Sequence, residues 1–153
     1  MTMTTTLTTR CLSGFDDPCF GRDEWNRLLR ESRIDSAYLT WEFQRAWWDT
    51  PRPDQALLLV AAERDGSVIA VAPFYVDSDV VYLIGTDFEY DGLGFLGSNE
   101  VLNDVDVLAA LLATAAEAVV ELEGFELLRA RGQTVGGGHG GGLRARRPRL
   151  LCR

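Results

Sequence analysis

The sequence of 153 residues contains no lysine, one histidine and three cysteines. A single histidine makes no metal site, and the spacing of Cys11, Cys19 and Cys152 matches no zinc or redox motif. The opening segment MTMTTTLTTR lacks the apolar stretch of a signal peptide, and no apolar run is long enough to span a membrane. We therefore expect a cytoplasmic protein that uses no metal and has no membrane partner.

Positive charge is scarce over most of the chain and abundant at its end. Residues 1–128 carry eight arginines and all 23 acidic residues, a net charge of −15, whereas residues 129–153 carry seven arginines and no acid. A strongly acidic body repels polyanions. We therefore expect no nucleic-acid partner, although the arginines of the last segment leave RNA binding as a weaker alternative.

Hydrophobic periodicity predicts two helices before a hairpin. Residues 21–33 place Trp25, Leu28 and Leu29 on one helical face, and residues 39–51 place Phe43 and Trp47 on another. Two apolar, β-favouring runs then flank the turn sequence RDGS, in which Asp-Gly suits a tight hairpin, and VVYLIG at 80–85 predicts a third strand.

The second half of the chain predicts a long helix followed by a strand. Residues 104–124 form the helix, with Asn103 or Asp104 as its cap, and FELLRA at 125–130 forms a fourth strand. The expected fold is α/β, with a mixed, partly antiparallel sheet that has helices on both faces and is incomplete. We expect a domain at 15–130, a disordered N-terminus at 1–14 and a disordered Gly/Arg tail at 131–153. The apolar stripe expected on the long helix consists of Leu108, Leu111, Leu112, Ala115, Val119 and Leu122.

Three stretches in this order resemble a known family. They are YLTWEFQRAWW at 38–48, VAAERDGSVIAVAPFYV at 60–76 and YLIGTDFEYDGLGFLG at 82–97. Together they resemble the GNAT acyltransferase superfamily, and within it the CelD/BcsL-type acetyltransferases associated with cellulose biosynthesis. Members of that family contain two GNAT-like units, and this chain resembles the first. The resemblance implies an acyl-CoA-dependent N-acyltransferase acting on an amine of a sugar or polysaccharide-related acceptor. The alternative is a non-catalytic GNAT-like module that supports another chain.

The loop that follows the third strand concentrates candidate catalytic residues. Asp87, Glu89 and Asp91 are carboxylates suited to removing an ammonium proton, and Tyr90 is suited to protonating a leaving thiolate. The alternative is a solvated acidic loop.

Aromatic residues of the second helix are candidates for the acceptor site. Trp41 and Trp48 could line a groove for the acceptor, because aromatic rings stack on sugar or acyl groups. The alternative is that these tryptophans belong to the core.

The last segment contains a string that fits an acyl-CoA loop. Gln133, Gly136 and Gly138 match the Arg/Gln-x-x-Gly-x-Gly/Ala pattern whose backbone N–H groups hold a pyrophosphate in GNAT proteins. The competing interpretation is that the tail is read out of frame, because its composition changes abruptly near Arg129. A missing second unit would leave apolar surface exposed, which predicts possible self-association.

Overall fold

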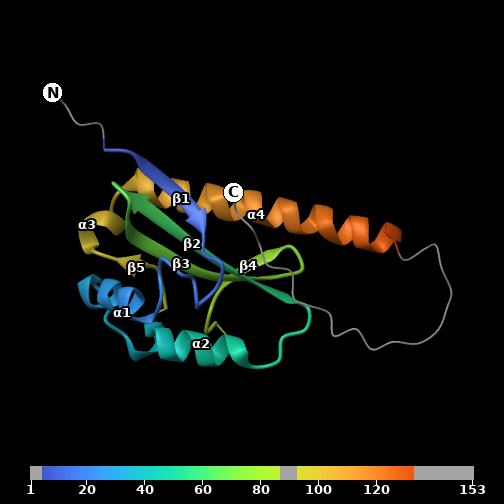
Figure 1. The fold of residues 1–153 in the computed structure, drawn as a ribbon, viewed down its shortest axis with the longest axis horizontal. Helices are drawn as coiled ribbons and strands as arrows, with labels where there is room; N and C mark the ends of the chain where they lie inside the picture. The colour runs from blue at the N-terminus through green and yellow to red at the C-terminus, as the bar shows by residue number, and fades with distance from the viewer. Residues whose placement is uncertain (1–4, 87–92, 133–153) are drawn as a thin grey trace.

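The computed structural model describes residues 5–86 and 93–132, with side chains described as far as residue 122. Its centre is a five-stranded sheet in the order β1-β2-β3-β4, in which β5 also pairs with β3 (Figure 1). Every described strand pair is antiparallel. The strands are β1 (Leu7–Cys11), β2 (Gln55–Arg64), β3 (Ser67–Asp77), β4 (Val80–Leu83) and β5 (Leu96–Gly97).

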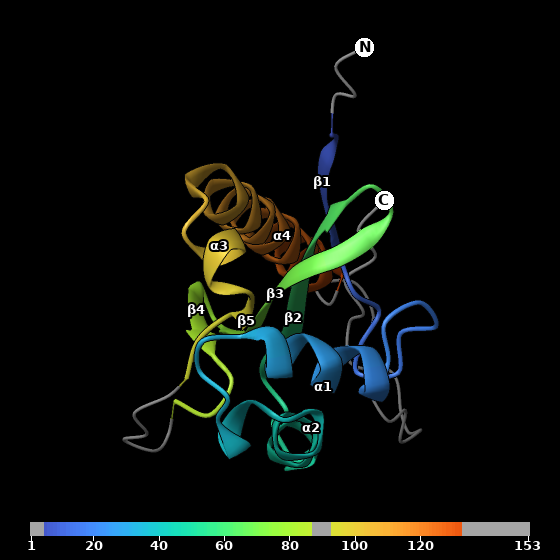
Figure 2. The same cartoon turned by 90° about the vertical axis from the view of Figure 1, so that its left-hand side faces the viewer.

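Helices cover both faces of this sheet, as the sequence predicted. Figure 2 shows α1 and α2 on one side of the sheet and α3 and α4 on the other. The helices are α1 (Arg22–Glu31), the short 3-10 helix η1 (Ala37–Leu39), α2 (Trp41–Asp49), α3 (Asn99–Leu102) and α4 (Val105–Gly132). The α/β class and the two covered faces are thus confirmed.

Local sequence explains where these elements begin and turn. The Thr40 hydroxyl accepts from the Phe43 N–H at the start of α2, and the Asp104 carboxylate accepts from the Asp106 N–H at the start of α4. Asp65 and Gly66 have φ values of 53° and 79°, the left-handed conformation that a two-residue hairpin turn requires. Of the two predicted caps for the long helix, Asp104 is the one observed, and the predicted hairpin is confirmed.

The prediction of a strand at 125–130 is wrong, because α4 continues to Gly132. The segment is rich in Leu, Glu, Arg and Ala, which favour helix, and a continuing helix satisfies its backbone groups without a neighbouring strand. Gly124 costs about 1 kcal/mol inside a helix and does not end this one. With this strand absent, no crossover connection brings a parallel strand into the described sheet. The mixed sheet expected from the sequence is instead antiparallel throughout the described residues.

The prediction of a disordered N-terminus at 1–14 is wrong for residues 7–11. They form β1, which pairs with β2 from Leu7 opposite Arg64 to Cys11 opposite Val60. The Thr9 hydroxyl also lies 2.6 Å from the hydroxyl of Thr114 on α4. Thr-rich segments suit an edge strand, because β-branched side chains pack well on a pleated surface.

The core is divided between the two faces of the sheet. The face toward α1 and α2 buries a cluster dominated by aromatic rings, whereas the face toward α4 buries mainly Val, Leu and Ala. The stripe predicted for α4 is partly wrong: Leu111 and Ala115 are buried, but Leu112 is 54% exposed. Val107 and Ala118 are buried in its place, because the axis of α4 presents them to the sheet.

Candidate functional site: the base of the 87–92 loop

The predicted catalytic residues lie outside the described part of the chain. Asp87, Glu89, Tyr90 and Asp91 occupy the undescribed segment 87–92. The predicted acyl-CoA residues, Gln133, Gly136 and Gly138, follow α4 and also lie outside the described residues. The structure does show the framework from which the loop emerges. We call this framework the loop base and define it as residues 84–86 and 93–95 together with Gln44 and Tyr75.

The loop emerges where the partner of β3 is interrupted. β3 pairs with β4 as far as Phe74 opposite Leu83, and with β5 from Val71 opposite Leu96. Between these two pairings, the Pro73 carbonyl accepts a hydrogen bond from the Ile84 N–H at 3.0 Å. The nitrogen and the carbonyl of one strand residue point to the same side, so the Pro73 nitrogen also faces the gap between β4 and β5. Because proline has no N–H, the gap leaves no unpaired donor there. Prolines within sheets are confined to edges and bulges, and the interruption provides a local edge within an inner strand.

Gly85 brings the two ends of the loop close together. Its φ is +97°, and a Cβ added to it would lie 3.1 Å from Leu93 Cδ2 and 3.8 Å from Phe43 Cε1. The backbone at this position therefore requires glycine for its conformation and for the close approach of Leu93. A side chain here would push apart the two ends of the loop.

Gln44, on α2, forms a hydrogen bond with the start of the loop. Its side chain is fully buried, and Nε2 donates to the carbonyls of Tyr38 at 2.7 Å and Ile84 at 3.4 Å. Its Oε1 is buried and has no hydrogen-bond partner within the described structure. A buried acceptor without a donor costs about 1–3 kcal/mol. Our sequence reading missed Gln44, although its spacing of three and four residues from Trp47 and Trp48 places it on their buried face.

Tyr75 holds the loop base from the sheet side. Its hydroxyl lies 3.3 Å from the Thr86 hydroxyl, so it reaches the last described residue before the loop. Its ring stacks on Tyr82 with centroids 5.3 Å apart and packs against Trp47 at 5.1 Å. Three aromatic neighbours, Trp48 included, therefore fix the position of this hydroxyl.

The two tryptophans predicted to line an acceptor groove occupy different environments. Trp48 is 6% exposed and packs beside Tyr75, a core position that matches the alternative interpretation. Trp41 is half-buried, its indole N–H donates to the Phe15 carbonyl at 3.0 Å, and the Arg45 guanidinium lies over its ring. Trp41 is thus held at the rim of the aromatic cluster, whereas Trp48 lies within it.

A buried carboxylate marks a second polar centre near the end of β1. Burial alone would raise the pKa of Asp17, but hydrogen bonds from the Ser13 and Cys19 backbone N–H groups and from Arg10 lower it below its ordinary value of 3.8. Arg10 also donates to Glu63 at 2.6 Å. All of these contacts join β1, the segment before α1 and β2, so this network stabilises the fold.

No protein-family model, curated protein or solved structure matches the chain. Within residues 5–86 and 93–132, no three His, Cys, Asp or Glu side chains are grouped so that they could hold a metal ion. None of the described helices is both long enough and apolar enough to cross a membrane.

Proposed function

We propose that this chain is the first unit of an acyl-CoA-dependent N-acyltransferase of the GNAT type, with an amine of a sugar or polysaccharide-related compound as acceptor. The observation that supports this best is the element order. Two helices, a hairpin, a third antiparallel strand and a long helix on the opposite face follow the order expected from the sequence, although the strand expected at 125–130 is absent and β1 and β5 were not expected. The acidic and aromatic loop then begins at an interruption of the sheet, where Gly85, Gln44 and Tyr75 fix its ends.

The chemistry requires a base and an acid close to a thioester. A carboxylate of Asp87, Glu89 or Asp91 takes a proton from the acceptor ammonium, and the neutral amine attacks the thioester carbonyl. The C–N bond forms as the C–S bond breaks. The thiolate takes a proton from Tyr90, which recovers one from the nitrogen, so that the protons balance.

Acyl-CoA is the co-substrate of this reaction. In this proposal the backbone around Gln133, Gly136 and Gly138 holds its pyrophosphate, and no metal takes part. Trp41, at the rim of the aromatic cluster, is better placed than the buried Trp48 to meet an acceptor.

The test is a calorimetric titration of the full chain with acetyl-CoA, followed by a thiol-release assay with glucosamine as the amine. We expect saturable binding, and a rate that falls about 10²–10⁴-fold in the Asp87→Asn or Asp91→Asn variant that removes the base. Gly85→Ala, which disturbs the loop base, should lower the rate without abolishing acetyl-CoA binding. Gly66→Ala is the matched control, because it alters a positive-φ glycine in a hairpin turn with open space around it. Absence of acetyl-CoA binding by the folded chain would overturn the proposal.

A non-catalytic module is the second candidate function, and the edge of β4, which has no strand partner among the described residues, favours it. β4 pairs with β3 on its other side, and its residues Val80 and Tyr82 are 44% and 40% exposed. An edge strand with exposed apolar side chains is suited to pairing with another chain. A cooperatively folded chain that binds no acetyl-CoA would select this function over the first.

A further inference from the structure

The outer face of α4 carries an exposed apolar stripe. Val105 is 74% exposed, Leu112 54% and Val120 67%, and Ala109, Ala113 and Ala116 between them are also exposed. On a helix these positions share one face, opposite the buried Val107 and Ala118. Single exposed apolar residues are ordinary, but a contiguous stripe marks an interaction surface. We call this surface the outer stripe; it consists of Val105, Ala109, Leu112, Ala113, Ala116 and Val120.

The shape of the outer stripe suits another helix. Its residues form two rows at spacing i, i+4, one through Val105, Ala109 and Ala113 and one through Leu112, Ala116 and Val120. Two such rows with a groove between them are the surface used when helices pack ridge into groove. Alanines occupy the middle of the stripe, so the backbone of a partner helix can approach closely.

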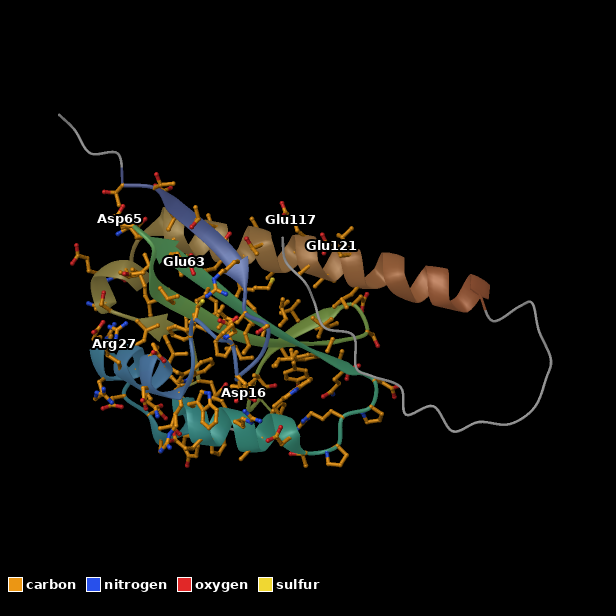
Figure 3. The ribbon with its side chains drawn as sticks, in the orientation of Figure 1. Asp16, Arg27, Glu63, Asp65, Glu117 and Glu121 are labelled. Carbon is orange, nitrogen blue, oxygen red and sulfur yellow. The ribbon has the colours of Figure 1, made fainter. Side chains whose placement is uncertain are left out.

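The flank of the outer stripe nearer β1 is acidic. Asp106, Glu117 and Glu121 are exposed on this flank, and none of the three forms an ion pair within the described residues. Figure 3 shows Glu117 and Glu121 projecting from α4. A partner that covers the apolar stripe therefore brings its own flank against three carboxylates, and basic side chains complement them.

A second copy of the chain fits this surface less well. An antiparallel pairing centred between Leu112 and Ala113 would match the apolar residues, but it would place Asp106 of one copy near Glu117 of the other. Each copy also has a net charge of −8. Like charges across an interface disfavour association.

We propose that the outer stripe of α4 docks a basic amphipathic helix of another protein. Its apolar side chains, at spacing i, i+3, i+4 and i+7, fill the groove between the two rows, and Arg or Lys on one flank faces Asp106, Glu117 and Glu121. This surface lies on the opposite side of the sheet from α2 and the Gln44 contact, so the proposal does not depend on acyl transfer.

The experiment uses the full chain and two labelled synthetic helical peptides of 18 residues. Both carry leucine at i, i+3, i+4 and i+7; one has arginine along one flank and the other glutamate at the same positions. Fluorescence anisotropy should show that the arginine peptide binds at least tenfold more tightly, and that added salt weakens its binding.

Variants of the exposed residues locate the binding surface. Leu112→Asp should reduce binding of the arginine peptide at least tenfold, whereas Ile34→Asp, at an exposed apolar residue beyond α1, should leave it unchanged. The double variant Glu117→Arg, Glu121→Arg should reverse the preference to the glutamate peptide. Circular dichroism checks that each variant is folded.

Three results would overturn the proposal. The first is equal binding of both peptides, and the second is an unchanged preference in the charge-reversed variant. The third is a dimer in sedimentation velocity that Leu112→Asp abolishes while neither peptide binds, because a second copy would then be the occupant.

Discussion

The two faces of the sheet are built from different side chains. The face toward α1 and α2 buries aromatic rings, among them Trp25, Trp47 and Tyr75, whereas the face toward α4 buries aliphatic residues around Phe74. The aromatic side also has directional bonds: the Trp25 indole N–H donates to the Leu39 carbonyl at 2.8 Å. Tryptophan and tyrosine rings, whose N–H and O–H groups form hydrogen bonds, favour one arrangement of their neighbours. Aliphatic side chains chiefly require that the available volume be filled.

This difference matches the two surfaces that we propose for function. The loop base rests on the aromatic side, where Gln44 and Tyr75 hold it through hydrogen bonds. The outer stripe lies on the helix that the aliphatic side holds in place. α4 also extends beyond the sheet (Figure 1). A site that needs fixed geometry thus lies on the more directional face, and a surface that needs only shape and charge lies on the other.

The largest effect should come from removing an aromatic anchor. Trp25→Ala is expected to cost about 3–5 kcal/mol in unfolding free energy, because it removes a side chain that is 1% exposed together with its hydrogen bond. Leu111 is fully buried on the other face, and Leu111→Ala should cost less, about 2 kcal/mol, which is the low end for buried Leu→Ala substitutions. Urea unfolding measures both. If Leu111→Ala is the more costly substitution, the contrast between the faces fails.

The next largest loss of stability should come from Gly97, in the strand β5 that follows the 87–92 loop. Gly97 has a φ of +152°, and a Cβ there would lie 3.0 Å from the backbone oxygen of Ile69. We expect Gly97→Ala to cost about 3 kcal/mol in unfolding free energy, because both strain and a clash with backbone result. Gly66→Ala, at a φ of +79° with open space around it, should cost about 1 kcal/mol. Equal losses of stability in the two variants would show that crowding at β5 is unimportant.

The network at Asp17 should give a pH-dependent effect. The pKa of Asp17 is lowered in the folded state, so its carboxylate stabilises the protein above the ordinary value of 3.8, and this contribution is lost as the pH falls through the folded pKa. Asp17→Asn is expected to cost about 1–3 kcal/mol near neutral pH. The difference in unfolding free energy between the two proteins should shrink as the pH falls below 3.8. A constant difference down to acid pH would exclude this linkage.

The smallest effect should come from the polar contact on the aliphatic face. Thr114→Val removes the hydroxyl that lies 2.6 Å from the Thr9 hydroxyl, and Thr9 is half-buried and can turn to water. We expect a loss below about 1 kcal/mol, measured by thermal unfolding. Trp25→Phe, which removes a directional bond of the aromatic face, is the comparison, and it should cost more. If Thr114→Val lowers the unfolding free energy more than Trp25→Phe does, directional hydrogen bonds matter on the aliphatic face as well, and the contrast between the two faces is wrong.

Local signals in the sequence predicted much of the fold. Periodicity located α1 with Trp25, Leu28 and Leu29 buried, and Asp65-Gly66 located the hairpin. The same signals failed for Leu112, because a helix of mostly apolar residues offers several possible faces and only contact with the sheet selects one. For Gln44 the spacing indicates a buried face, but its role in holding the loop base depends on carbonyl partners that only the tertiary structure supplies.

The sequence by itself determined the elements whose cause is local: helix caps, the hairpin turn and the amphipathic face of α1 follow from residues close together in the chain. Only the tertiary structure decided the long-range features. β1 forms because β2 supplies its backbone partners 49 to 57 residues away, and β4 and β5, although separated by a loop, pair with the same strand on either side of Pro73. Backbone hydrogen bonds and buried volume must be satisfied by whichever segments meet in space, and one-dimensional periodicity carries no information on which segments those are.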